Sequence, residues 1–320
     1  MYSVEIDEYV SHECDMEHKY YLEDYEGEMA RWCKGCGDHA ILSSVQKIFR
    51  DRQINPESVV CVSGIGCSSR FPYYLKTYGF HGIHGRALPI STGVSIARPD
   101  LHVLTVMGDG DCFSIGAGHW IHALRYNVNL TVMVFDNEVY ALTKKQASPT
   151  TKSGVSTNTT PKGAYLEALN PLSTILGVTN VSFLAQTATW LPAHLGETLQ
   201  KAWDHNGLSF VRILQRCPIF SPNAFMEGNQ VKVAMKFLDY PGGIPITQAL
   251  KKMGEVVEHD FRDLDAARKI AGNIAVEPIG LLYHNPAIPT YNEIRHSKVV
   301  HKSLQERAAD LNKELDKYLV

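Results

Sequence analysis

The stretch that decides the fold is Val103-Leu-Thr-Val-Met107, followed at once by Gly108-Asp109-Gly110-Asp111. The apolar run predicts a buried strand, the glycines predict a tight turn, and the residues from Phe113 onward have a helical pattern. A second apolar run, Leu130-Thr-Val-Met-Val-Phe135, then leads into Asp136-Asn137. Strand, turn, helix and strand in this order predict an α/β fold, with polar residues at the carboxyl ends of two parallel strands.

The same alternation extends along most of the chain. Strands are expected near Ser58–Val62, His102–Met107, Leu130–Phe135 and Leu208–Leu214, and helices near His39–Phe49, Phe113–Tyr126, Ala164–Leu176 and Leu191–His205. This pattern predicts a doubly wound, mostly parallel sheet with helices on both faces. Ligands bind such sheets beyond the carboxyl ends of the strands, so the loops after residues 62, 107 and 135 are expected to meet at one pocket.

Three regions follow from the composition. Residues 1–30 are acidic and aromatic without a regular period, and we expect an extension that lies over this chain or a partner. Residues 31–220 carry the alternating pattern and form the predicted main domain. Residues 221–320 form a predicted C-terminal extension that packs on this domain and on a partner subunit. It should contain a short strand at Ile279–Tyr283 and a final charged helix with an apolar stripe at Leu304, Leu311, Leu315 and Leu319.

Bulk properties exclude several classes of protein. The 320 residues carry a formal net charge of −3, and Lys and Arg gather on no segment, which argues against a nucleic-acid-binding protein. The start, Met1-Tyr-Ser-Val-Glu-Ile-Asp, lacks the basic residues and apolar run of a signal peptide. The apolar runs have the length of strands and are shorter than the ~20 residues of a membrane helix. We therefore expect a cytoplasmic protein without a membrane partner.

The glycine turn has the chemistry of a diphosphate site. Glycines let the backbone approach a diphosphate closely, and free amides at the start of a helix donate to its oxygens. Magnesium prefers oxygen ligands, which Asp109, Asn137 and the carbonyl of Val139 can supply from adjacent strand ends. For the tripeptide alone, a purely structural turn is the alternative interpretation. A nicotinamide or flavin site is not favoured, because its motif requires glycine where Phe113 stands.

The seven cysteines, at positions 14, 33, 36, 61, 67, 112 and 217, are more typical of thiols or metal ligands than of disulfides in a reducing compartment. Cys33 and Cys36 have the two-residue gap of a paired metal ligand, with Gly35 in the turn. Cys67 and Cys217 each follow a predicted strand, so the fold can bring them to the same edge of the sheet. We assign the remaining three cysteines, Cys14, Cys61 and Cys112, to packing or to the surface.

Four thiolates can hold either a 4Fe–4S cluster or a structural zinc ion. Zinc ribbons usually present two closely spaced pairs of cysteines. Here the set consists of one closely spaced pair, Cys33 and Cys36, and two single cysteines far away in the sequence, Cys67 and Cys217. This arrangement favours a cluster held by a folded domain, and zinc stays open as the alternative.

Six motifs in order resemble the β subunit of 2-oxoacid:ferredoxin oxidoreductases, over roughly residues 31–220. They are Trp32-Cys-Lys-Gly-Cys-Gly-Asp38, Gly64-Ile-Gly-Cys-Ser-Ser-Arg70, His84-Gly-Arg-Ala-Leu-Pro89, Gly108-Asp-Gly-Asp111, Asp136-Asn-Glu-Val-Tyr140 and Gln146-Ala-Ser-Pro-Thr150. The resemblance implies the diphosphate-binding half of a thiamine-diphosphate-binding fold.

The resemblance also implies the cofactors and their residues. Thiamine diphosphate would be bound by His84, Gly85, Arg86, Gly108, Asp109, Gly110, Asp111, Asn137, Val139, Tyr140, Leu142 and Thr143. Magnesium would be held by Asp109, Asn137 and the Val139 carbonyl, and one 4Fe–4S cluster by Cys33, Cys36, Cys67 and Cys217. The implied reaction is the coenzyme A-dependent oxidative decarboxylation of a 2-oxoacid, with ferredoxin as electron acceptor. A partner α subunit would supply the carboxylate that protonates the cofactor's aminopyrimidine ring, so the chain is expected to act only in a complex, such as one of two α and two β subunits.

Two positions depart from the family's pattern. Lys34 stands where the family commonly has proline, and Lys144 and Lys145 stand where glycine is usual at one or both positions. For the substrate we expect a carboxylate contact from Arg70, which favours 2-oxoglutarate over pyruvate, with Lys144 as a second candidate. Alternatively, Arg70 pairs with a structural acid or with the diphosphate. Two rival functions are a thiamine-dependent decarboxylase or synthase without redox chemistry, and a non-catalytic interaction protein.

Overall fold

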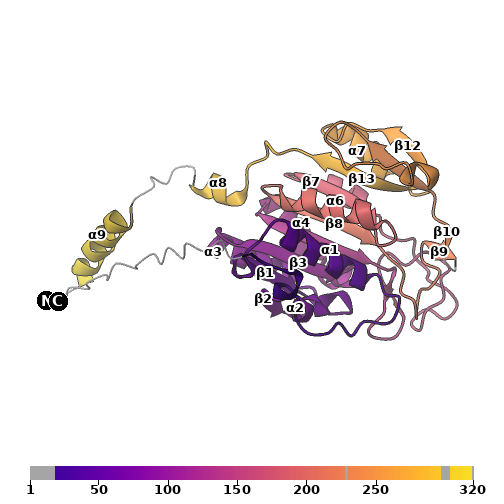
Figure 1. Cartoon of the computed structure of the whole chain (residues 1–320), viewed down its shortest axis with the longest axis horizontal. Helices are drawn as coiled ribbons and strands as arrows, with labels where there is room; N and C mark the ends of the chain where they lie inside the picture. The colour runs from indigo at the N-terminus through magenta and orange to yellow at the C-terminus, as the bar shows by residue number, and fades with distance from the viewer. Residues whose placement is uncertain (1–18, 228–229, 297–302, 319–320) are drawn as a thin grey trace.

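The computed structural model describes residues 19–227, 230–296 and 303–318. Its core is a nine-stranded sheet with the strand order β12-β11-β13-β7-β8-β4-β3-β1-β2 (Figure 1). In chain order these strands are β1 (Val59–Ser63), β2 (Tyr78–His81), β3 (His102–Gly108), β4 (Leu130–Asp136), β7 (Phe183–Ala188), β8 (Leu208–Leu214), β11 (Met235–Asp239), β12 (Glu255–Glu258) and β13 (Glu277–His284). The doubly wound, mostly parallel sheet expected from the sequence is confirmed.

One antiparallel pair divides the sheet. The six strands from β7 to β2 are parallel to one another, and β13 pairs antiparallel with β7. Because β11 is parallel to both β12 and β13, the three C-terminal strands run opposite to the other six. The carboxyl ends of the six strands therefore share an edge of the sheet with the amino end of β13. Residues beyond 220 thus extend the sheet of the main domain.

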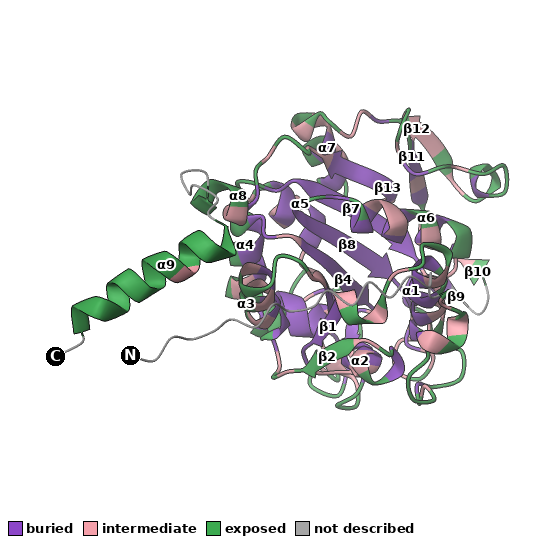
Figure 2. Ribbon diagram, turned by 60° about the vertical axis from the view of Figure 1, so that its left-hand side comes forward, coloured by how far each residue is buried: buried purple, intermediate pink, exposed green. Residues whose placement is uncertain are grey.

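Helices cover both faces of the sheet, whose central strands are buried (Figure 2). One face packs against α1 (Asp38–Asp51), α2 (Phe71–Tyr74) and α6 (Pro192–Trp203). The other packs against α3 (Ala87–Ala97), α4 (Ala117–Tyr126), α5 (Pro171–Leu176) and α7 (Leu264–Ala271). Two helices follow β13, α8 (Tyr291–His296) and α9 (Leu304–Leu315), and two small hairpins pair β5 (Val139–Tyr140) with β6 (Gln146–Ala147) and β9 (Met226–Glu227) with β10 (Gln230–Val231).

Some element boundaries differ from the expectation. The helix expected at Ala164–Leu176 begins only at Pro171, because proline disfavours a helical residue before it and Asn170 caps the helix by accepting from Ser173 N. The helix expected at Phe113–Tyr126 is broken at Gly116, with a π-helical turn at Asp111–Ile115 before α4. The first strand begins one residue later than expected, at Val59.

The described part of the acidic N-terminal segment lies over this chain. Tyr25 is fully buried, with its hydroxyl 3.0 Å from the carbonyl oxygen of Phe49 and 2.7 Å from that of Ile54. Glu26 forms a β-bridge with Leu75. In the C-terminal stripe, Leu304, Leu311 and Leu315 are exposed and Leu319 lies outside the described residues. No helix within the described ranges combines the length and apolar character needed to cross a membrane.

Candidate functional site

A cavity lies at the shared edge, beyond the carboxyl ends of β1, β3 and β4. The loops after these strands meet there, as the sequence predicted. Among the residues expected to bind cofactor, those that line the cavity are His84, Gly108, Asp109, Gly110, Asp111, Asn137, Val139, Tyr140, Leu142 and Thr143. One cysteine of the expected cluster, Cys67, lines the same cavity.

Asp109 is buried in the wall of this cavity and is held by two hydroxyl groups. The hydroxyl of Ser148 donates to Asp109 Oδ2, and Thr150 Oγ1 lies 2.8 Å from the same oxygen. Burial and the nearby carboxylate of Asp136 raise the pKa of Asp109 to about 8, although both hydroxyl contacts lower it. The carboxyl group is therefore held in one orientation, in an environment that disfavours its charge until a cation binds.

Thr150 also links Asp109 to a buried ion pair. Its Oγ1 lies 2.8 Å from Asp136 Oδ1, and the guanidinium of Arg212 lies 2.7 Å from Asp136 Oδ2. Arg212 also pairs with Glu277 at the start of β13, with 3.3 Å between Arg212 Nη1 and Glu277 Oε2. Burial lowers the pKa of Arg212, but the carboxylates of Asp136 and Glu277 raise it above its ordinary value. Thus five residues connect the cavity to the antiparallel part of the sheet.

Asp111 ties the loops around the cavity together. Its Oδ1 accepts from Gly85 N at 2.7 Å and from Ile65 N at 3.2 Å, and it lies 2.6 Å from His84 Nδ1. A Cβ at Gly64 would lie only 1.9 Å from Asp111 Oδ2, so that position requires glycine. This carboxylate therefore fixes the loops after β1 and β2 to the turn after β3.

The donor set at the cavity fits magnesium. Asp109 offers a carboxylate, Asn137 an amide oxygen and Val139 a carbonyl, and all three residues line the cavity. Magnesium prefers hard oxygen ligands of these kinds. The turn beside them is closely packed, since Tyr140 donates to the carbonyl oxygen of Gly110 at 3.0 Å and a Cβ at Gly110 would lie 2.2 Å from the Tyr140 ring.

The structure brings the four expected cluster cysteines into one neighbourhood. Burial raises the pKa of Cys67 to about 12, with Asp38, Cys217 and Cys33 contributing in the same direction. The pKa of Cys36 is also raised, by burial and by neighbours that include Cys67 and Cys217. Packing agrees with this arrangement, because Cys67 packs against the small buried cluster that contains Cys217, and Cys36 and Cys67 pack against one core cluster.

Local backbone contacts hold these cysteines in place. Gly35, at a φ of +81°, allows the turn in which Cys36 N donates to the carbonyl oxygen of Cys33 at 3.0 Å. Trp32 Nε1 donates to the carbonyl oxygen of Cys67 at 2.7 Å. No three His, Cys, Asp or Glu side chains of the described ranges are arranged to hold a single metal ion. A 4Fe–4S cluster, which is larger than one ion, keeps its thiolate ligands further apart.

The remaining cysteines and the expected substrate residues lie elsewhere. Cys61 and Cys112 are fully buried in the core, and Cys14 lies outside the described residues. Arg70 is half-buried beside Tyr74, whose hydroxyl accepts from its Nε at 2.8 Å, and it does not line the cavity. Arg86 reaches the carbonyl oxygen of Ile115 at 3.3 Å, also outside the cavity.

Lys144 and Lys145 occupy the two positions at which the family usually has one or two glycines. The backbone conformation at these positions explains the preference for glycine. Both have positive φ angles, of 79° and 70°, in the left-handed region that suits glycine best. Asn158 holds this turn, since its N donates to the carbonyl oxygen of Lys145 at 2.9 Å and its Nδ2 donates to that of Lys144. Lys144 does not line the cavity.

The sequence alone gave no role to Ser148, Thr150, Asp136 or Arg212, which support Asp109. The first three lie in motifs quoted above for the family resemblance, so their place in those motifs was the only signal for them in the sequence.

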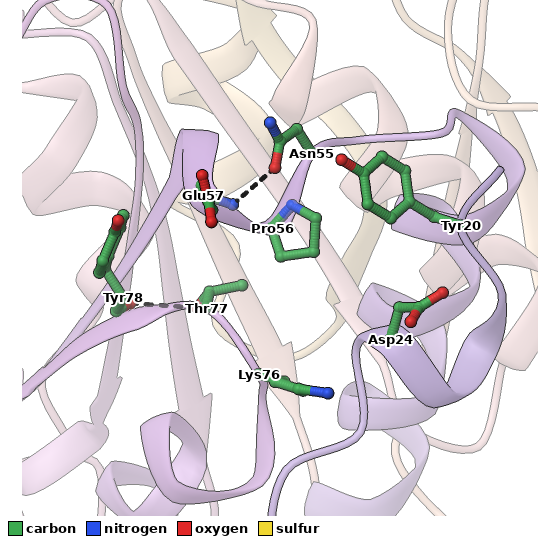
Figure 3. A pocket seen from close by; sticks show the side chains of 8 residues that line it. All are labelled: Tyr20, Asp24, Asn55, Pro56, Glu57, Lys76, Thr77 and Tyr78. Carbon is green, nitrogen blue, oxygen red and sulfur yellow. Dashed lines mark hydrogen bonds between the residues drawn. The ribbon is translucent and has the colours of Figure 1, made fainter. Parts of the chain in front are cut away.

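A separate pocket at the amino ends of β1 and β2 is drawn in Figure 3. Its lining is Tyr20, Asp24, Asn55, Pro56, Glu57, Lys76, Thr77 and Tyr78. This pocket lies at the opposite ends of these strands from the loops that carry the quoted motifs.

The fold and the cavity define a thiamine-diphosphate-binding domain. Residues 64–213 match the family model described as thiamine pyrophosphate enzyme, C-terminal TPP binding domain. That range begins directly after β1 and includes β3, β4 and all the expected magnesium ligands.

More specific relatives cover most of the chain. It is 39% identical over 296 residues to the 2-oxoglutarate oxidoreductase subunit KorB of Mycobacterium tuberculosis, covering 84% of this chain and 79% of that protein. It is 36% identical over 265 residues to the 2-oxoacid:ferredoxin oxidoreductase subunit beta of Saccharolobus solfataricus, covering 82% and 84%. A solved 2-oxoglutarate:ferredoxin oxidoreductase from Magnetococcus marinus aligns with a TM-score of 0.75 at 33% identity, covering 91% of this chain and 96% of that one.

This chain belongs to the family of β subunits of the 2-oxoacid:ferredoxin oxidoreductases, which are enzymes. The resemblance found in the sequence is thereby confirmed, and so is the expected fold. Its relatives are named as β subunits, which implies a partner α subunit.

Proposed function

We propose that this chain binds thiamine diphosphate and one 4Fe–4S cluster and acts with an α subunit as a cytoplasmic 2-oxoglutarate:ferredoxin oxidoreductase. The reaction would convert 2-oxoglutarate and coenzyme A to succinyl-CoA, with ferredoxin as electron acceptor. One observation carries the proposal: an oxygen donor set for magnesium and four neighbouring thiols gather at the carboxyl edge of one sheet.

Each part of the site has a task under this proposal. Asp109, Asn137 and the Val139 carbonyl would hold magnesium against the diphosphate, and backbone amides of the turn that follows Gly108 would donate to its oxygens. When bound, thiamine diphosphate supplies the carbon that attacks the 2-oxo group and stabilises the charge left by decarboxylation. Cys33, Cys36, Cys67 and Cys217 would hold the cluster beside the cavity that Cys67 lines, so the path for electrons is short.

The metal assignment is tested by anaerobic purification of the chain together with its α subunit, followed by metal analysis. We expect a brown protein with four iron atoms for each β chain, and thiamine-dependent, coenzyme A-dependent reduction of a viologen dye. Cys217→Ser should lose the visible absorbance, whereas Cys112→Ser, which alters a core cysteine, should keep it. A colourless zinc-containing complex would contradict the cluster and favour the non-redox rival.

The choice of 2-oxoglutarate rests on Arg70 and on relatives that are named for this substrate, among them KorB of Mycobacterium tuberculosis. The Magnetococcus marinus structure has 2-oxoglutarate, coenzyme A and succinyl-CoA bound. Arg70 forms no ion pair with an acid of the described ranges, which weighs against the alternative of a structural acid as its partner. Its other N–H donors are therefore available to a distal carboxylate.

A substitution at Arg70 separates the substrates. Arg70→Met should weaken the use of 2-oxoglutarate by about 2–5 kcal/mol in kcat/KM and leave pyruvate nearly unchanged. Equal losses on both substrates would show that Arg70 does not select the distal carboxylate. Arg98→Met provides a matched control, because Arg98 is an exposed arginine paired with Asp100.

A further inference from the structure

Helix α9 has a defined start and an exposed apolar face. Ser303 Oγ accepts from Glu306 N at 3.2 Å, and the Glu306 carboxylate accepts from Ser303 N at 2.7 Å, which forms a capping box. Leu304 is 82% exposed, Leu311 60% and Leu315 54%. Figures 1 and 2 show the helix standing away from the sheet. Because a helix of this length is marginal alone, its leucines need a partner surface.

The spacing of this apolar face is that of a coiled coil. Leu304, Ala308, Leu311 and Leu315 of α9 are separated by four, three and four residues, and Tyr318, in the 3-10 turn that follows the helix, comes three residues later. This is the alternation of the two core positions of a heptad repeat, at which each side chain packs between side chains of a facing helix. A helix that packs on an irregular surface does not need such regular spacing. The pattern therefore favours another helix as the partner.

Charges beside the core positions indicate which helix and which orientation. Arg307 and Glu314 occupy equivalent positions on one side of the apolar face, seven residues apart. In an antiparallel pair of identical helices, this side of one helix faces the same side of the other. Arg307 of each copy then faces Glu314 of the other, which gives two ion pairs related by symmetry. Side chains at these positions set partner choice and orientation in coiled coils.

The same antiparallel alignment also suits the residues in the core of the helix pair and those on the side away from Arg307 and Glu314. When Arg307 faces Glu314, Ala308 of one copy lies opposite Leu311 of the other, so a small residue meets a large one. On the other side, Gln305 lies opposite Asn312, and their amides can exchange hydrogen bonds. In a parallel pair Arg307 would instead face Asn312, and both ion pairs would be lost.

We propose that α9 pairs antiparallel with α9 of a second copy of this chain. In the single chain Glu314 accepts from Lys317 at 2.6 Å, but both side chains are exposed, and such a pair is readily exchanged. A pair of helices with so few core layers is too short to hold a dimer by itself. The contact therefore rests on the proposed assembly containing two β subunits, in which it would join chains that are already close.

A photocrosslinking amino acid in the assembled enzyme tests this pairing. With p-benzoylphenylalanine at position 311, irradiation should give a product with the mass of two β chains, crosslinked to residues 304–311 of the second copy. The same amino acid at position 313, on the outer face of the helix, should give little of this product. A crosslink to the α subunit or within one β chain, or equal yields from the two positions, would overturn the proposal.

Charge reversal tests the orientation with the same readout. Arg307→Glu places like charges together twice and should lower the yield about fivefold. The double variant Arg307→Glu and Glu314→Arg restores opposite charges and should restore the yield. A yield unchanged by Arg307→Glu would refute the antiparallel register. Viologen reduction by the same preparations reports the proposed function separately, so activity without a β–β product would refute only the helix pairing.

Discussion

Thr150→Val tests whether the hydroxyl groups around Asp109 prepare the magnesium site. The substitution keeps the shape of the side chain and removes a hydroxyl that lies 2.8 Å from each of two buried carboxylates, those of Asp109 and Asp136. Hydrogen bonds to charged groups contribute about 1.5–3 kcal/mol. Residues that orient a metal ligand typically change metal affinity about 10- to 100-fold. We expect a loss of that size in the magnesium-dependent affinity for thiamine diphosphate.

The assay is the binding of thiamine diphosphate at a series of magnesium concentrations, followed by calorimetry together with thermal unfolding. Thr105→Val is the matched control, because the buried hydroxyl of Thr105 in β3 donates to Ser91 Oγ in α3 at 2.7 Å but does not contact Asp109. Both variants should lose some stability. If Thr150→Val required no more magnesium than Thr105→Val, the hydroxyl would have only a structural role and the reasoning would fail.

Three further predictions follow from the same network and its neighbouring turn. Since the pKa of Asp109 is raised to about 8, the stabilising effect of this carboxyl group on the metal-free protein is complete below about pH 4 and is lost as the pH rises through about 8. Magnesium must displace the carboxyl proton, so the affinity for magnesium should rise up to tenfold per pH unit between about pH 6 and pH 8. A magnesium affinity that calorimetry finds independent of pH would contradict this. Arg212→Met should lower the free energy of unfolding by about 3–5 kcal/mol, because Asp136 would stay buried without its partner, and adding Asp136→Asn should recover part of the loss in denaturant titrations. Lys144→Gly and Lys145→Gly should each raise the free energy of unfolding by about 0.5–1 kcal/mol, because glycine relieves the strain of a positive φ, whereas Lys162→Gly should not raise it. If the Lys144 ammonium contacts substrate, only Lys144→Gly should also raise KM.

The parallel strands were predictable because their signal is local. Continuous β-branched runs such as Leu130–Phe135 are typical of strands buried on both faces, and β4 ends within one residue of the prediction. Strand β7, Phe183–Ala188, was missed because its alanines, glutamine and threonine form no such run. It is buried by its neighbours β8 and β13, so tertiary packing decides its conformation.

The candidate site was predictable only as far as the topology decides it. Parallel strands place their carboxyl ends at one edge, so the loops that carry Cys67, Asp109 and Asn137 had to meet. The contacts of Ser148 and Thr150 with Asp109 join residues 39 and 41 positions apart, with α4 and β4 between them, and no periodic pattern encodes these contacts. The departure at Lys144 and Lys145 was visible in the sequence, but only the positive φ angles show why glycine suits these positions.

The reversed direction of the C-terminal strands explains how the segment beyond residue 220 reaches the site. Because β13 runs opposite to its neighbour β7 and to β8 beyond it, its first residue, Glu277, lies at the edge where those strands end, and it meets Arg212 at 3.3 Å. A parallel β13 would place its carboxyl end there instead, and Glu277 would lie at the far edge of the sheet. Glu277 shares the charge of Arg212 with Asp136, and Asp136 is joined through Thr150 to Asp109. A carboxylate outside the region that resembles the family in the sequence therefore shares the guanidinium that pairs with Asp136, next to the proposed magnesium ligand.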